Sequence, residues 1–168
     1  MATKFEEMRA AARDSLNRKA EYQQRCFSHM QRLYRGFLKY CEIPENQVSF
    51  WRWNGLVGEE AEFTRLQKNE PNNVLTAMVL GEDGFWRLGL RINLMAGAVF
   101  FPIWISERDG AAVTKIADET ISIDLDNERQ CAEFYDKVVD RVKETFSDGK
   151  KSKTRGYGFA VDPQPDSP

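Results

Sequence analysis

The sequence lacks long hydrophobic runs and has little histidine and cysteine, and each shortage excludes a class of protein. No stretch of about 18 consecutive apolar residues is present, so a transmembrane helix is not expected. A single histidine argues against zinc sites built from several histidines. The three cysteines form no C-x-x-C pair, which favours free thiols in a reducing compartment. Because the first residues are charged, unlike a signal peptide, we expect a soluble, cytoplasmic protein with no membrane partner.

The remaining composition is that of one globular domain, with 168 residues of which 42% are hydrophobic and 30% charged. We predict a single α+β domain over residues 1–147, followed over residues 148–168 by a flexible tail that is basic and then proline-rich. The net charge of −2 is unevenly spread, because residues 1–40 hold nine basic against four acidic side chains and residues 41–147 hold eleven against nineteen. Such a chain is suited to binding a polyanion, or to pairing its own charges within the fold or a dimer.

Two long helices are predicted at the ends of the domain. Thr3 and Glu6 have the spacing of a capping box, so the first helix starts near Lys4. From Leu16 to Cys41 apolar residues recur at three- and four-residue steps, which places them on one buried face. Pro44 ends this helix near Cys41 or Glu42. The last helix runs from about Asn127 to Phe146 and is capped by Asp126.

The residues between the helices predict a five- or six-stranded antiparallel sheet, mostly in meander order, with the C-terminal helix packed on one face. Turns are expected at Asn54-Gly55, Gly81–Gly84 and Asp109-Gly110, where glycine allows positive backbone dihedrals. The candidate strands are Val48–Trp53, Ala61–Leu66, Val74–Leu80, Phe85–Leu94, Ala98–Ile105, Ala112–Ile116 and Thr120–Leu125.

The strand Ala98–Ile105 is apolar on both faces, and this feature suggests an interaction surface. Pro102 cannot donate a ladder hydrogen bond, which favours an edge or a bulge. A two-layer monomer is not expected to hide both faces, so a helix or a second subunit should cover them. We therefore predict a non-enzymatic binding or adaptor protein, a homodimer that also recognises a protein partner through an aromatic and arginine-rich sheet face. Its interface residues are Phe85, Arg87, Arg91, Phe101 and Trp104.

An alternative is nucleic-acid binding by the first helix. Cations recur there every seven residues and form a nearly straight ridge, which could neutralise several phosphates. Lys150 and Lys151 in the tail would assist. The basic ridge consists of Arg18, Tyr22, Arg25, His29, Arg32 and Lys39.

No pattern in the sequence predicts catalysis, and we assign no catalytic residue, cofactor or metal ligand. Cys26 and His29 lie three residues apart on a helix, a spacing compatible with a thiol and imidazole pair. A nucleophile also needs a third orienting group and oxyanion donors, so a buried thiol beside a surface histidine is preferred. A third alternative is a pocket for a small apolar ligand between the sheet and the helices.

Overall fold

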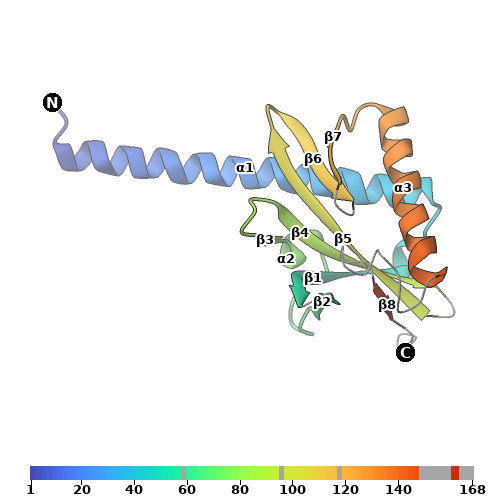
Figure 1. Ribbon diagram of the computed structural model, residues 1–168. Coiled ribbons are helices and arrows are strands. Elements are labelled where there is room, and N and C mark those ends of the chain that lie inside the picture. Colours follow the sequence, from blue (N-terminus) through green and yellow to red (C-terminus); the bar gives the residue numbers. More distant parts are fainter. Residues whose placement is uncertain (58–59, 95–96, 117–118, 148–159, 163–168) are drawn as a thin grey trace.

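The computed structural model describes residues 1–57, 60–94, 97–116, 119–147 and 160–162. It has the predicted α+β class, with a long N-terminal helix, an antiparallel sheet and a C-terminal helix (Figure 1). The helices are α1 (Lys4–Tyr40), the short α2 (Val74–Ala77) and α3 (Glu128–Ser147), with a 3-10 turn, η1, at Glu45–Gln47. The strands are β1 (Val48–Val57), β2 (Glu60–Arg65), β3 (Val79–Leu80), β4 (Trp86–Leu94), β5 (Gly97–Arg108), β6 (Ala111–Ile116), β7 (Glu119–Ile123) and β8 (Ala160–Asp162).

Helix α1 starts where the sequence predicts. The Thr3 side chain accepts a hydrogen bond from the Glu6 backbone N–H, while the Glu6 carboxylate accepts one from the Thr3 N–H, so the capping box is complete. The helix ends at Tyr40, four residues before Pro44. At α3 the cap is Asn127 rather than Asp126, because the Asn127 side chain accepts from the Gln130 N–H.

The sheet follows the order β2-β1-β4-β5-β6-β7, with β3 paired to β4 and β8 paired to β5. From β4 to β7 each strand pairs with the next, which is the predicted meander. Strand β8 comes from the segment predicted as a tail, and the rest of that segment, including Lys150 and Lys151, lies outside the described residues. In the described part of the chain no helix is long and apolar enough to cross a bilayer.

Two of the three predicted turns are confirmed. Gly84 has a φ of 82° in the β3–β4 hairpin, and Asp109 and Gly110 have φ values of 52° and 78° between β5 and β6. The third is wrong, because β1 continues through Asn54 and Gly55 as a strand with an irregularity in its register.

Val74–Leu80 is also not a single strand. The Asn73 side chain accepts a hydrogen bond of 2.9 Å from the Thr76 N–H and starts α2, which leaves only Val79 and Leu80 for β3.

Strand β5 is buried on both faces within this one chain, which corrects the expectation that a second subunit is needed to cover it. Its residues from Gly97 to Ile105 are all buried. On one face Val99, Phe101, Ile103 and Ile105 join the main core with α1 and α3. The other face packs into an aromatic cluster formed by Trp51, Trp53, Phe63, Phe100 and Trp104, with ring centroids 4.8–6.1 Å apart.

The prediction that Pro102 marks an edge is wrong as well. Strand β5 pairs with β4 along one side, and with β8 and β6 along the other. The β8 ladder covers Ala98–Phe100 and the β6 ladder covers Ser106–Arg108. Pro102 lies between these two ladders, so its missing N–H interrupts neither of them.

Candidate functional site

The most unusual surface of the molecule is the N-terminal half of α1, which projects from the body as an isolated helix (Figure 1). We call residues 4–21 the arm. All of its residues are exposed except Ser15, which is half-buried. Contact with the body begins at Tyr22, whose hydroxyl lies 3.1 Å from the Ser106 Oγ atom on β5. Beyond that point α1 contributes Cys26, Met30 and other residues to the main core.

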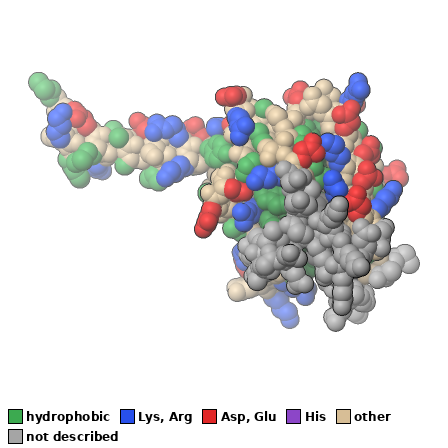
Figure 2. All heavy atoms as spheres, viewed as in Figure 1, with side chains coloured by type: hydrophobic (Ala, Val, Ile, Leu, Met, Phe, Trp, Pro, Cys, Tyr) green, Lys and Arg blue, Asp and Glu red, His purple; other side chains and the backbone are tan. Residues whose placement is uncertain are grey.

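The arm carries an apolar stripe that continues the buried face of α1. Phe5, Met8 and Leu16 have 63%, 64% and 66% of their surface exposed. Together with Ala12 they recur at three- and four-residue steps, and they lie on the same side of the helix as Cys26 and the rest of the packed face. We call Phe5, Met8, Ala12 and Leu16 the arm stripe. Figure 2 shows hydrophobic side chains interleaved with basic and acidic ones along the arm.

A helix of this length gains little stability by itself in water, because most helical stability in proteins comes from packing an amphipathic face. The capping box, the alanines at positions 10–12 and the ion pair between Lys4 Nζ and Glu7 Oε2, at 3.1 Å, support the arm locally. None of them covers the arm stripe. A row of large exposed apolar side chains on a helix is characteristic of a contact surface.

The basic ridge is not one free cationic surface. Arg25 Nε lies 2.8 Å from Glu107 Oε1, and Arg32 Nη2 lies 2.6 Å from Asp126 Oδ1. His29 Nε2 lies 3.0 Å from the second oxygen of Glu107. The middle of the ridge therefore pairs with carboxylates of the body. Arg18, on the arm, and Lys39, near the end of α1, remain exposed on either side of this paired region. The Tyr22 hydroxyl forms a hydrogen bond with the Ser106 side chain on β5.

The predicted interface residues do not form one exposed surface. Phe101 is buried against the helices, whereas Trp104 is buried on the opposite face in the aromatic cluster. Arg91 has only 2% of its surface exposed, with its guanidinium 5.8 Å from the centre of the Phe100 ring. Phe85 and Arg87 are half-buried near the β3–β4 turn, where Lys115 Nζ lies 4.2 Å from the Phe85 ring centre. The sheet face predicted to be an aromatic and arginine-rich interface is thus largely internal.

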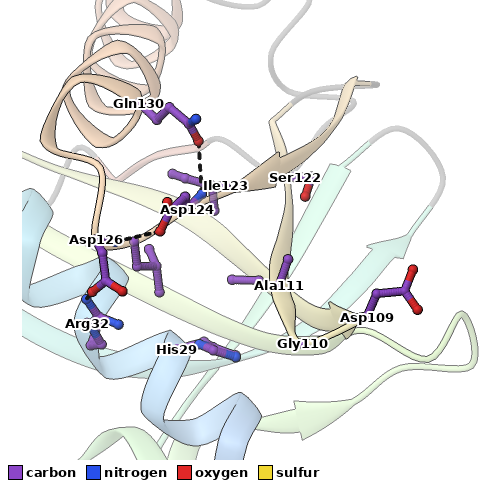
Figure 3. A pocket seen from close by; sticks show the side chains of 12 residues that line it. His29, Arg32, Asp109, Gly110, Ala111, Ser122, Ile123, Asp124, Asp126 and Gln130 are labelled. Carbon is purple, nitrogen blue, oxygen red and sulfur yellow. Dashed lines mark hydrogen bonds and ion pairs between the residues drawn. The ribbon is translucent and has the colours of Figure 1, made fainter.

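A polar cleft of about 490 Å³ lies beside the paired part of the ridge (Figure 3). His29 and Arg32 line it from α1, Asp109 from the β5–β6 turn, and Asp124 and Asp126 from the segment between β7 and α3. The Asp124 N–H donates to the Gln130 side chain at 3.0 Å, and the Asp126 N–H donates to the Asp124 carboxylate at 3.0 Å. These hydrogen bonds hold the segment that leads into α3, while the helix itself is capped by Asn127. Among the described residues, no group of three or more His, Cys, Asp or Glu side chains is arranged to hold a metal ion.

Glu107 joins α1 to the β5–β6 hairpin at the edge of this cleft. Its side chain is 9% exposed and holds Arg25 with one oxygen and His29 with the other. Burial by itself would raise the pKa of Glu107, but the hydrogen bonds from Arg25 and His29 outweigh burial and lower the pKa below its ordinary value. The ionised carboxylate therefore fastens the hairpin to the helix at the point where the arm leaves the body.

We expect Glu107→Gln to lower the free energy of unfolding by about 1–3 kcal/mol at neutral pH, because it removes a charge-assisted acceptor shared by two donors. Since the pKa of Glu107 is lower in the folded chain, its contribution is present above its ordinary pKa and is lost as the pH falls through the lower folded value. Urea titrations at several pH values should show the difference between the two proteins shrinking in acid.

The matched control is Glu133→Gln, because Glu133 pairs with Arg129 on an exposed part of α3 at 3.2 Å. This change should alter the free energy of unfolding by less than about 0.5 kcal/mol at any pH. A Glu107→Gln effect that stays constant down to pH 3 would contradict the assignment of the linkage to Glu107.

Cys26 and His29 do not form a nucleophile pair. Cys26 is fully buried, and burial raises the pKa of its thiol. His29 is not the surface residue expected, because its side chain is only 18% exposed, with Nε2 directed to Glu107 and Nδ1 buried without a hydrogen-bond partner. The pair therefore has neither an ionised thiol nor an open approach for a substrate.

One apolar cavity lined by described residues lies between the sheet and the helices, and it is small. Leu33, Phe101, Pro102 and Phe134 are among the residues that line it, and its volume is about 20 Å³. A space of this size holds about one water molecule. It offers no room for the small apolar ligand considered as a third alternative.

The sequence signal for the arm was present but incomplete. The predicted apolar face begins at Leu16, although Phe5, Met8 and Ala12 extend it toward the N-terminus at the same spacing. The acceptors of the basic ridge, Glu107 and Asp126, lie far from it in sequence, so no local pattern could identify them.

The chain was compared with known proteins at three levels. No protein-family model matches it, and neither a curated protein nor a solved structure shows significant similarity.

Proposed function

We propose that this chain is a non-enzymatic binding or adaptor protein, and that its contact surface is the arm rather than the sheet face. The observation that carries the proposal is the exposure of about two thirds of Phe5, Met8 and Leu16 on a helix that projects away from its own body. Helix-in-groove and helix-to-helix recognition use anchors at this spacing.

The charges of the arm favour a protein partner over nucleic acid. Residues 4–21 hold five basic and four acidic side chains, so the arm is nearly neutral. Nucleic acid would require an excess of cations, and Arg25 and Arg32 of the basic ridge already pair with Glu107 and Asp126. Filter binding at two salt concentrations tests the nucleic-acid alternative, because phosphate contacts weaken steeply as salt is raised.

The setting that we propose for this binding is the cytoplasm. Cys26, Cys41 and Cys131 are all free thiols. Burial raises the pKa of each thiol, which favours its protonated, unreactive form. Cysteines that remain free thiols are typical of a reducing compartment.

Capture experiments with matched variants test the arm as a contact surface. Tagged wild-type protein and a Met8→Glu/Leu16→Glu double variant would be incubated with extract of the source cells, and the retained proteins quantified by mass spectrometry. We expect at least one retained protein, either the chain itself or another, to fall about tenfold or more with the double variant, because two charges replace the central apolar anchors.

The control is Leu75→Glu/Leu80→Glu, which places the same charges on exposed leucines of the body, 56% and 53% exposed. This variant should retain the same proteins as the wild type. Identical recovery with the arm variant and the wild type would mean that the arm is not the contact surface.

A further inference from the structure

We infer that the partner of the arm is the arm of a second copy of this chain, packed antiparallel about a two-fold axis near Ala10 and Ala11. This inference rests on the proposed function, since it names the occupant of the same surface. A two-fold interface uses the same surface on both subunits, so that surface must be complementary to itself. Apolar side chains of one arm must therefore face apolar or small side chains of the other, and charged side chains must face opposite charges.

The apolar residues of the arm meet this requirement in one antiparallel register. When Leu16 lies opposite Phe5 of the partner subunit, Phe5 lies opposite the partner's Leu16, and Met8 falls within one residue of the level of the partner's Ala12. Between these layers Arg9 falls opposite the partner's Ala12, a small residue that leaves space for the longer side chain. The Arg9 guanidinium already lies 5.7 Å from the centre of the Phe5 ring in its own chain, which places its charge beside the seam rather than inside it.

The charges at the edge of the seam agree with the same register. Glu6 and Arg13 are seven residues apart and flank the seam on one side. In the antiparallel arrangement Glu6 lies next to Arg13 of the partner subunit, and the two-fold axis repeats this pair, giving two opposite-charge contacts. Charges at such flanking positions determine partner choice and orientation in paired helices.

A parallel pair of arms would be poorly matched. It would place Lys19 beside the partner's Lys19 along the seam itself. Like charges at facing positions are destabilising. The parallel arrangement would also bring both bodies to the same end of the pair, whereas the antiparallel one places them at opposite ends.

The length of the arm fits the antiparallel register. The partner's helix begins at Lys4, which falls opposite Asn17, and its first three residues extend beside residues 18–20. Contact with the body begins at Tyr22, immediately beyond this overlap. The arm is therefore long enough to receive a full partner arm without a collision with the body.

Sedimentation equilibrium of the purified full-length chain tests the inference. We expect a monomer–dimer equilibrium that is measurable below about 500 μM. Leu16→Glu should weaken dimerisation about tenfold or more, and Arg13→Glu about three- to tenfold, because the latter places a carboxylate beside Glu6 of the partner subunit.

Two matched controls locate the effect. Asp14→Arg reverses an exposed charge on the side of the arm that faces away from the seam, and Leu80→Glu places a charge on an exposed leucine of the body, so both should leave the dissociation constant within about twofold. Circular dichroism would confirm that every variant remains folded.

The outcomes separate this inference from the proposed function. A chain that stays monomeric at about 500 μM, yet retains another protein through the arm in the capture experiment, overturns the second copy as partner and leaves the arm as a contact surface. A dimer that Leu16→Glu and Arg13→Glu leave unchanged overturns the inference, because its interface must lie elsewhere. A monomer that shows no arm-dependent capture contradicts both.

Discussion

Replacing Leu33 with alanine is expected to lower the free energy of unfolding by about 3–4 kcal/mol, a large part of the stability of an ordinary domain. Leu33 lies on α1 with 1% of its surface exposed, at the point where the helix covers the sheet. It lines the cavity of about 20 Å³ beside Phe37 and Phe101, so removing its side chain enlarges an existing void. Packing around a rigid sheet allows little relaxation to fill such a space.

The matched control is the same substitution on the arm of the same helix. Leu16 is 66% exposed, and Leu16→Ala should change the free energy of unfolding by less than about 0.5 kcal/mol in dilute solution. Urea unfolding followed by tryptophan fluorescence measures both, because the four tryptophans lie in the body. Equal losses for the two variants would show that the arm is part of the cooperative fold, contrary to its isolation in the structure.

Gly36→Ala is expected to destabilise the chain by about 2 kcal/mol, although glycine to alanine in a helix interior ordinarily stabilises by about 1 kcal/mol. A Cβ atom at position 36 would lie 2.1 Å from the Tyr135 hydroxyl oxygen. Tyr135 lies on α3 and is buried, with its ring centre 5.8 Å from that of Phe37. The glycine therefore sets how closely α1 and α3 approach.

A double-mutant cycle with Tyr135→Phe isolates this contact. Removing the hydroxyl oxygen leaves the ring carbon that carried it 3.1 Å from the added Cβ, a tight contact that a small shift of the helix would relieve. In the Tyr135→Phe background we therefore expect Gly36→Ala to be close to neutral, with a coupling free energy of about 1–3 kcal/mol. Thermal unfolding of the four proteins measures the cycle, and additive effects would mean that the hydroxyl is not the obstacle.

Local patterns predicted the elements whose stabilising contacts are close in sequence. The capping box of α1 joins Thr3 to Glu6, and the hairpin at Gly81–Gly84 and the turn at Asp109-Gly110 depend on adjacent residues. Prediction failed where two local signals competed. Asn54-Gly55 favours a turn, but pairing of β1 with β2 continues through these residues.

The candidate site was predicted less well, because its character depends on contacts between distant segments. Arg25 and Arg32 were correctly placed on one exposed ridge of a helix, but their partners Glu107 and Asp126 reach them only after β5 and α3 pack against α1. Likewise Phe101 and Trp104 are apolar strand residues in sequence, and only the aromatic cluster on the second face of β5 explains how one chain buries both.

The sequence by itself determined the α+β class, the extent of the two long helices and the meander from β4 to β7, because periodicity, caps and turn residues act over a few neighbouring positions. The tertiary structure decided which part of the apolar face of α1 stays exposed to solvent. The stripe on α1 is continuous from Phe5 to Leu38 in the sequence, but the body is only long enough to cover it from Tyr22 onward. The point at which α1 extends beyond the sheet depends on how the helix and the sheet pack together. No single segment of the sequence encodes that point.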